Sequence, residues 1–179
     1  MSSQVINPYM LVSPSVPIDY EQTSGGDSAV FQDGTVAVAT KIFGEMVANT
    51  SSVLFGKKIT NIEIPLQRQD FPASYVYCRH YDASLTLITD YWNKEANHLT
   101  TGMIFYGDGL FTGTDTAFAV GDFFCTEYAN AGAKYVLSQH TGSGSVFDGS
   151  NTHEIKVNNS GTITTSGTTK DINFKITVV

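Results

Sequence analysis

Apolar and polar residues alternate along most of this chain in short runs, and the runs end at Gly, Asn, Asp, Pro or Ser. A period of two is the mark of a β-strand with one buried face, and the bounding residues are common turn formers. The last run is the clearest, because Ile172, Phe174, Ile176 and Val178 are all separated by single residues. We therefore expect a core strand at the end of the chain and no long amphipathic helix.

The same pattern predicts strands over most of the remaining sequence. We expect them at 36–40, 45–48, 58–68, 75–81, 85–89, 103–106, 118–120, 123–128, 135–139, 153–157, 161–164 and 171–178. Pro65 lies inside one of them and lacks an amide proton, which predicts an edge strand or a bulge there. Many short strands at near-regular spacing predict an all-β fold, an antiparallel two-sheet β-sandwich of the jelly-roll type.

The first thirty residues break the pattern. Pro8, Pro14 and Pro17 interrupt regular structure, and residues 24–27 read as a Gly-rich loop. Residues 1–30 are accordingly predicted to be an irregular N-terminal arm or linker, with a short strand at 9–12, and residues 31–179 to be the sandwich domain.

Composition narrows the function classes. Of the 179 residues, 41 % are hydrophobic and only 15 % charged, and the net charge is −7. The basic residues are scattered, so no surface for nucleic acid is expected, and no apolar stretch approaches the ~18 residues that span a bilayer. The polarity must come from Ser, Thr, Asn and Gly, as in many extracellular and virion proteins, and we expect a virion or extracellular surface location.

From about residue 41 onward, short pieces of sequence follow a recognisable order. They are Phe43-Gly44-Glu45, residues 52–59, the long strand that follows, residues 75–84, residues 119–122 with Glu127-Tyr128, and residues 147–152. In this layout the chain resembles a recurrent jelly-roll module of archaeal, bacterial and viral surface proteins, which is similar to carbohydrate-binding modules. The resemblance implies the fold more than the function. The chain departs from the module at His80, where an aliphatic residue is usual.

Strand parity orients several side chains of the predicted strand 75–81. Cys78 and His80 share its core-facing row, so His80 is predicted to be a hydrogen-bonded core residue. Cys125 lies opposite to the row of Phe124, so the two cysteines are expected to face different sides and to remain free thiols. The other face of the strand carries Tyr75, Tyr77, Arg79 and Tyr81, a composition favoured at protein interfaces.

Two kinds of ligand site are considered. Tyr91, Trp92 and Asn93 are the candidate glycan-binding residues, because residues 90–95 read as a polar loop and an exposed indole ring can stack on a sugar. Core packing of Trp92 is an equal alternative. Asp82, Asp148 and Asn151 are candidate calcium ligands, since carboxylate and amide oxygens suit this ion. The competing interpretation is that they form turns.

No motif for catalysis is present in the sequence, and an enzyme is not expected. The first hypothesis is a structural subunit of a virion or extracellular assembly that binds copies of itself or other particle proteins. The N-terminal arm would hold a neighbour, and the candidate assembly residues are Tyr9, Met10, Leu11, Val12, Ile18 and Tyr20. The alternative hypothesis is a carbohydrate- or receptor-binding adhesion module with an exposed aromatic site near Trp92, whose partner would be a surface glycan.

Overall fold

The structure is a computed structural model, and it describes residues 15–23, 27–31, 40–69, 75–109, 115–128, 134–141, 146–147, 150–165 and 170–179. The strands are β1 (Ile18–Gln22), β2 (Asp27–Phe31), β3 (Thr40–Val47), β4 (Ile59–Gln69), β5 (Tyr75–Tyr81), β6 (Leu87–Glu95), β7 (Ile104–Tyr106), β8 (Phe123–Tyr128), β9 (Lys134–Thr141), β10 (Thr152–Asn158), β11 (Ile163–Thr165), β12 (Lys170–Ile172) and β13 (Phe174–Val178). One 3-10 turn, η1 (Ala96–His98), follows β6. Within these residues no helix has the length and apolarity to cross a membrane.

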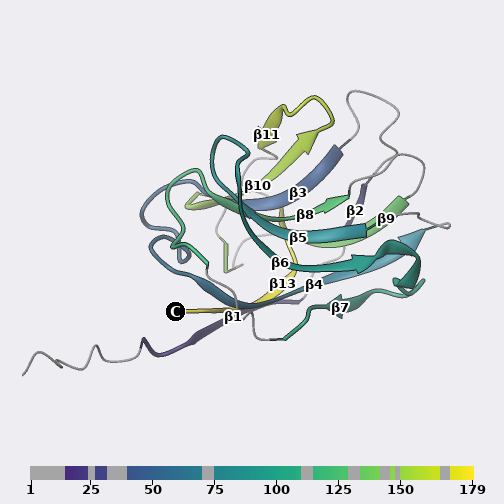
Figure 1. The fold of residues 1–179 in the computed structure, drawn as a ribbon, viewed down its shortest axis with the longest axis horizontal. Helices are drawn as coiled ribbons and strands as arrows, with labels where there is room; N and C mark the ends of the chain where they lie inside the picture. Colours follow the sequence, from purple (N-terminus) through teal and green to yellow (C-terminus); the bar gives the residue numbers. More distant parts are fainter. Residues whose placement is uncertain are drawn as a thin grey trace, which may run out of the picture.

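Two antiparallel sheets pack face to face, as predicted (Figure 1). The larger sheet has the order β1-β13-β4-β9-β12, with β2 paired to β9 and β7 paired to β4. The smaller has the order β11-β10-β3-β8-β5-β6. The all-β sandwich is thus confirmed, while the jelly-roll type remains a prediction.

The main core fills the space between the two sheets. Phe124 of β8 meets Phe147 and Phe174, whose rings stack with centroids 4.5 Å apart. Trp92 of β6 reaches across, and its Nε1 donates a hydrogen bond of 2.9 Å to the carbonyl oxygen of Ile62 in β4. Aromatic side chains bury large apolar areas and therefore dominate the packing of such a core.

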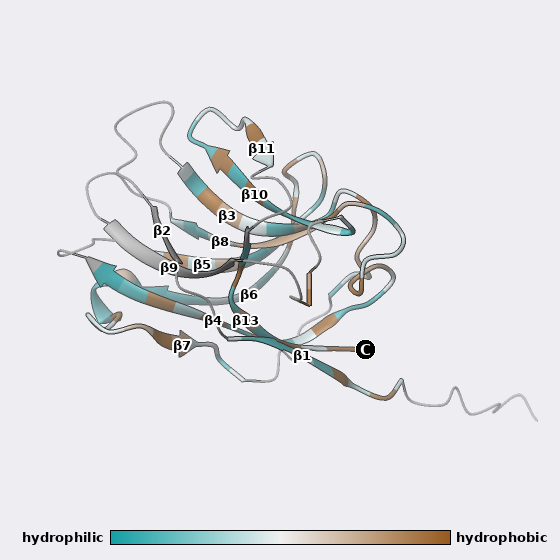
Figure 2. Cartoon of the chain, turned by 180° about the vertical axis from the view of Figure 1, so that it is seen from behind, coloured by the Kyte–Doolittle hydropathy of each residue, from teal (hydrophilic) through white to brown (hydrophobic). Residues whose placement is uncertain are grey.

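A second apolar cluster covers the outer face of the six-stranded sheet. Its buried members are Ile42, Tyr81, Phe123, Cys125, Ile155 and Val157, and Met46, Leu85 and Ile163 pack against them. Every residue of β8 is buried as a result. Figure 2 shows hydrophobic residues along β3, β8 and β10 of this sheet. One sheet therefore has apolar packing on both faces, where a sandwich needs it only on one.

The two cysteines illustrate this two-sided burial. Cys78 belongs to the core between the sheets and Cys125 to the outer cluster. Their strands are neighbours, since Arg79 pairs with Cys125 and Cys78 pairs with Thr126. Both thiols are free, as strand parity predicted.

Several predicted elements differ from the observed ones. Residues 90–95, predicted as a loop, lie in β6, and residues 118–120 form only one isolated bridge, Phe55 to Phe118. The predicted final strand is divided at Asn173 into β12, which pairs with β9, and β13, which pairs with β1 and β4. Pro65 is not in an edge strand. It pairs with Phe105 of β7 on one side, and on the other side the pairing of β4 with β9 begins only at the next residue, Leu66.

The N-terminal segment contributes two strands to the larger sheet. β1, and β2 except for its last residue Phe31, fall within the residues 1–30 assigned to the arm, yet they pair with β13 and β9. The predicted strand at 36–40 reaches the described residues only at its last position, where β3 begins, and the predicted strand at 9–12 lies outside them.

A fully buried carboxyl group lies between the sheets. Glu45 of β3 pairs in register with Glu154 of β10, and its Oε1 accepts a hydrogen bond of 2.7 Å from the backbone N–H of Ile172. Burial, followed by the negative charge of Asp171, raises the pKa of Glu45 well above its ordinary value. The folded state consequently holds this proton more tightly than the unfolded chain does.

This carboxyl group makes stability depend on pH. Because the folded-state pKa of Glu45 is raised, protonated Glu45 contributes to the stability of the fold at low pH. This contribution to the free energy of unfolding is lost as pH rises through the folded-state pKa. Glu45→Gln keeps an oxygen for the Ile172 amide but cannot ionise, so it should raise the free energy of unfolding at pH 8 by about 1 kcal/mol or more. Urea unfolding at pH 5 and pH 8 measures this, with exposed Glu21→Gln as control. An equal effect of Glu45→Gln at both pH values would contradict it.

Candidate functional site

The residues predicted to bind a glycan do not form an exposed platform. Tyr91 and Trp92 are 6 % and 4 % exposed, and their polar atoms bond inside the protein. Asn93 alone of the three is exposed. A β-bulge between Cys78 and Arg79 in the pairing of β5 with β6 explains how the adjacent Tyr91 and Trp92 are both buried, because it disrupts the alternation of faces. The core-packing alternative for Trp92 is the one that the structure shows.

A polar network is buried at one end of the core. Asp115 accepts hydrogen bonds from the backbone N–H groups of Ile59 and Thr116 at 3.1 and 2.8 Å. Thr89 and Tyr91 of β6 donate their hydroxyl groups to the same carboxylate at 3.1 and 2.9 Å. This carboxylate therefore connects β4, β6 and the segment that follows residue 114.

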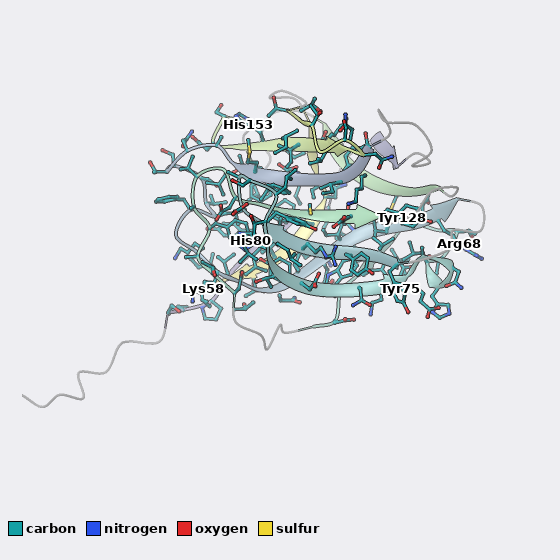
Figure 3. All side chains as sticks on the ribbon, turned by 45° about the horizontal axis from the view of Figure 1, so that its top comes forward. Lys58, Arg68, Tyr75, His80, Tyr128 and His153 are labelled. Atoms are coloured by element: carbon teal, nitrogen blue, oxygen red, sulfur yellow. The ribbon has the colours of Figure 1, made fainter. Side chains whose placement is uncertain are left out.

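His80 of β5 completes this network. Its Nδ1 lies 3.0 Å from Oδ1 of Asp115, and its Nε2 lies 3.6 Å from Oδ2 of Asp122. The ring stacks on Phe118 with a centroid distance of 3.8 Å, and none of it is exposed. Figure 3 places His80 among the interior side chains, at the opposite end of β5 from Tyr75. The prediction of a hydrogen-bonded core histidine is confirmed.

An Asp–His pair is a familiar catalytic device, but this one has no access to a substrate. A general base must reach the proton that it removes, and here Nε2 faces Asp122 inside the protein. Burial alone would raise the pKa of Asp115, yet hydrogen bonding and the charge of His80 lower it below its ordinary value. The network therefore fixes residues 115–122 against the sandwich.

A second charged group lies on the outer face of the six-stranded sheet. Glu127 of β8 accepts hydrogen bonds from Arg79 at 2.7 Å and from the hydroxyl of Tyr81 at 2.5 Å, both on Oε2. Its Oε1 lies 2.6 Å from Nζ of Lys41. Arg79 also bonds Asp90 and lies over the ring of Tyr77 at 3.9 Å. Two members of the row predicted on β5, Arg79 and Tyr81, thus meet at one carboxylate, whereas Tyr75 bonds Glu95.

The electrostatics of Glu127 follow from these partners. Burial would raise its pKa, but the hydrogen bonds of Lys41, Tyr81 and Arg79 lower it below the ordinary value. Burial and the bond to Glu127 raise the pKa of Tyr81, so its hydroxyl stays protonated and donates. Sequence reasoning missed Lys41 and Glu127. The available signal was an acidic residue in phase with Phe123 and Cys125 in an otherwise apolar strand.

Two of the three predicted calcium ligands, Asp82 and Asn151, lie in the described part of the chain. Oδ1 of Asp82 accepts the backbone N–H groups of Ser84 and Thr86, both at 2.8 Å, which is the turn-forming role. Asn151 accepts the Ala48 amide through its backbone oxygen, and Asp148 lies outside the described residues. Among the described residues, no group of three or more His, Cys, Asp or Glu side chains is placed to hold a metal ion.

The predicted assembly residues divide into three groups. Tyr9, Met10, Leu11 and Val12 lie outside the described residues. Tyr20 is partly buried against the chain's own core. Ile18 is 39 % exposed at the start of β1.

In comparisons with known proteins, no family model, curated protein or solved structure matches this chain. The resemblance to a jelly-roll module therefore still depends on the short pieces of sequence that suggested it. Function has to be argued from the geometry of the described residues.

The buried network can be tested through stability. Asp115→Asn removes the charge that His80 faces and replaces one acceptor oxygen with a donor, so it should lower the free energy of unfolding by about 2–4 kcal/mol at pH 7. Folding lowers the pKa of Asp115, so its carboxylate contributes to the free energy of unfolding at any pH above the unfolded-state pKa. This contribution is lost as pH falls through the folded-state pKa. The loss should therefore shrink in acid. Urea titrations at several pH values measure it.

Asp108→Asn is the matched control for this substitution. Asp108 is half exposed and pairs with Lys94 at the surface, where an ion pair contributes at most about 1 kcal/mol. If Asp115→Asn were no more destabilising than Asp108→Asn, the network would not be fixing the segment 115–122.

Proposed function

We propose that this protein is a structural subunit of an assembly, joined to copies of itself through β1 and the segment that precedes it. The observation that carries the proposal is an apolar row that continues past the chain's own core. Val16 and Ile18, at the start of this row, are 78 % and 39 % exposed. A virion or extracellular setting is part of the proposal, supported by the low content of charged residues.

The alternation along β1 defines this row. Ile18, Tyr20 and Gln22 occupy one face of the strand by its period of two, and Val16 extends the same row by one step. Gln22 is buried and bonds the carbonyl of Ile172, and Tyr20 packs on the core. Exposure thus rises steadily toward the N-terminal end, where the row passes the end of the sandwich.

The other face of β1 is attached to the same molecule. Asp19 accepts a hydrogen bond of 2.7 Å from the hydroxyl of Thr177, and Glu21 lies 3.7 Å from Nζ of Lys175. The strand is therefore held in place while its apolar row stays uncovered at one end. Figure 1 shows this end of β1, in dark purple, projecting away from the two sheets.

β1 also has an unpaired edge. In the described part of the sheet it hydrogen-bonds only β13. An edge strand presents free N–H and C=O groups that can pair with another chain, and an adjoining apolar row adds side-chain contacts to such pairing. A second copy of the chain supplies both, because it carries the same edge and the same row.

The alternative function, a glycan-binding module centred on Trp92, has no support from the geometry, because that ring is 4 % exposed and bonded across the core. An interface with nucleic acid is likewise not proposed, given a net charge of −7.

The proposal is tested by light scattering after size exclusion. The full chain should form a defined oligomer of its 19.4 kDa subunit. A variant lacking residues 1–17 loses Val16 and the segment before it but keeps all of β1, so it should stay folded by circular dichroism and associate more weakly than the full chain. Ile18→Lys should weaken association because it places a charge in the exposed row.

Ile104→Lys is the matched control. Ile104 is an isoleucine of similar exposure, 46 %, at the start of the short strand β7. It should leave the oligomer intact. A monomeric full chain, or unchanged assembly after the deletion, would overturn the proposal.

A further inference from the structure

Two hairpin loops over the outer face of the six-stranded sheet share one construction. The first, residues 82–86, joins β5 to β6, and its Asp82 side chain accepts the amides of Ser84 and Thr86. The second, residues 158–162, joins β10 to β11, and Oδ1 of Asn158 accepts the corresponding amides of Ser160 and Thr162 at 3.0 and 2.9 Å. An acceptor at the first position thus organises each loop.

The loops differ at their fourth position. In both loops the backbone at this position is left-handed, with φ of 64° at Leu85 and 80° at Gly161. Glycine takes this conformation without steric cost, whereas a leucine side chain is strained in it. Strain of this kind persists where the side chain has a role that offsets it.

The Leu85 side chain packs on the outer apolar cluster and meets the other loop. A Cβ atom added to Gly161 would lie 3.8 Å from Cδ1 of Leu85, so the two loops face each other at close range. Leucine on one side and glycine on the other leave an open hollow beneath them. This hollow is a pocket of about 160 Å³.

The walls of the pocket are of two kinds. Ile42, Leu85 and Val157 form an apolar side, and Lys41, Tyr81 and Glu127 form a polar one. The volume corresponds to about five water molecules at their share of liquid water, well below the roughly 300–1,000 Å³ of pockets for drug-sized ligands. A fitting ligand is therefore a molecule of few carbon atoms, or one end of a larger one.

Lys41 and Asn158 offer hydrogen-bond donors to the pocket. Both oxygens of Glu127 are engaged, by Lys41 on one side and by Arg79 and Tyr81 on the other. Oδ1 of Asn158 is engaged by its own turn, which leaves the amide nitrogen of that side chain as its donating end. Lys41 has three N–H groups, spends one on Glu127 and is 40 % exposed.

The pocket offers a cationic donor to a ligand. Lys41 and Arg79 both contact Glu127, and Arg79 also pairs with Asp90, so two cations and two carboxylates balance in charge here. Lys41 lines the pocket, and its Nζ has N–H groups left for a further acceptor. A carboxylate is the acceptor that forms the strongest hydrogen bonds with an ammonium group.

We propose that this pocket, at the meeting point of the two hairpin loops, binds a small carboxylate with a compact aliphatic body. The carboxylate accepts hydrogen bonds from Nζ of Lys41, and the body lies against Ile42, Leu85 and Val157. Leu85 keeps its strained backbone because its side chain forms the wall of this site. The proposal is independent of assembly through β1, which lies in the other sheet.

The first experiment is an NMR titration of the labelled full-length protein with isovalerate and, separately, with isovaleramide, which has the same body without the charge. Isovalerate should shift the amides of Ile42, Leu85 and Gly161 saturably, with a dissociation constant of about millimolar for so small a ligand. Isovaleramide should bind at least about tenfold more weakly. Absence of saturable shifts, or equal binding of the two compounds, would overturn the proposal.

Two sources of the carboxylate are distinguished by further probes. N-acetylvaline represents the end of a peptide chain, and glucuronate presents a carboxylate on a hydroxylated body. Binding of isovalerate or N-acetylvaline with rejection of glucuronate supports the aliphatic wall. Preference for glucuronate would contradict it.

Variants test the two walls separately. Lys41→Gln should weaken isovalerate binding by about tenfold, a loss of one charge-assisted contact, whereas exposed Lys58→Gln should leave it unchanged. Leu85→Gly relieves the backbone strain, so the protein stays folded while its affinity falls severalfold. Unaltered affinity in both Lys41→Gln and Leu85→Gly would show that the ligand binds elsewhere.

Discussion

Burial of both faces of the six-stranded sheet is the constraint on which the rest of this structure depends. Where this sheet is covered on both sides, above all along β8, its polar side chains have little access to solvent, so partners within the protein stabilise them. On the inner face Asp115 gathers two backbone amides, two hydroxyls and His80. On the outer face Glu127 gathers Lys41, Arg79 and Tyr81. These two carboxylates fix the relative positions of loops and strands, which apolar packing alone would not determine.

The sequence predicts the features of this fold that depend on one strand alone, namely where a strand lies and which face each side chain takes. The bounds of β5 and β8 coincide with the predicted runs, and parity alone placed Cys78 and Cys125 on opposite faces. His80 was assigned to the core from the same parity. Period-two alternation is a local signal, so it can be recognised without knowing which strands pair with one another.

Other features depend on partners that local patterns do not reveal. Trp92 stands among polar residues in sequence, and its burial results from the pairing of β6 with β5 and from a bond to the distant Ile62. The outer pocket is formed by two loops far apart in the chain, so no window of sequence contains it. The division of the last strand at Asn173 likewise reflects a change of partners, from β9 to β1 and β4. Tertiary context decides each of these points.

The open strand edge and the small pocket of this protein lie on different sheets. β1 leaves an edge and part of an apolar row open in the larger sheet, while the outer face of the smaller sheet is covered by hairpins that meet over a small hollow. The proposed association and the proposed ligand binding therefore use different sheets and different atoms. This division is consistent with a subunit whose interior sheet stays undisturbed when it joins neighbours.

The two thiols carry a consequence for how local opening of this protein can be observed. Burial raises the pKa of both Cys78 and Cys125 well above the ordinary value, so neither is a nucleophile while it remains covered. Cys78 is covered by the opposite sheet, whereas Cys125 is covered by the outer cluster to which Leu85 belongs. A thiol reagent reaches Cys78 only when the sheets part and Cys125 only when the outer cover lifts. The rates at which a thiol reagent modifies Cys78 and Cys125 therefore report two motions separately. The first is the opening of the space between the sheets, and the second is the opening of the outer cluster.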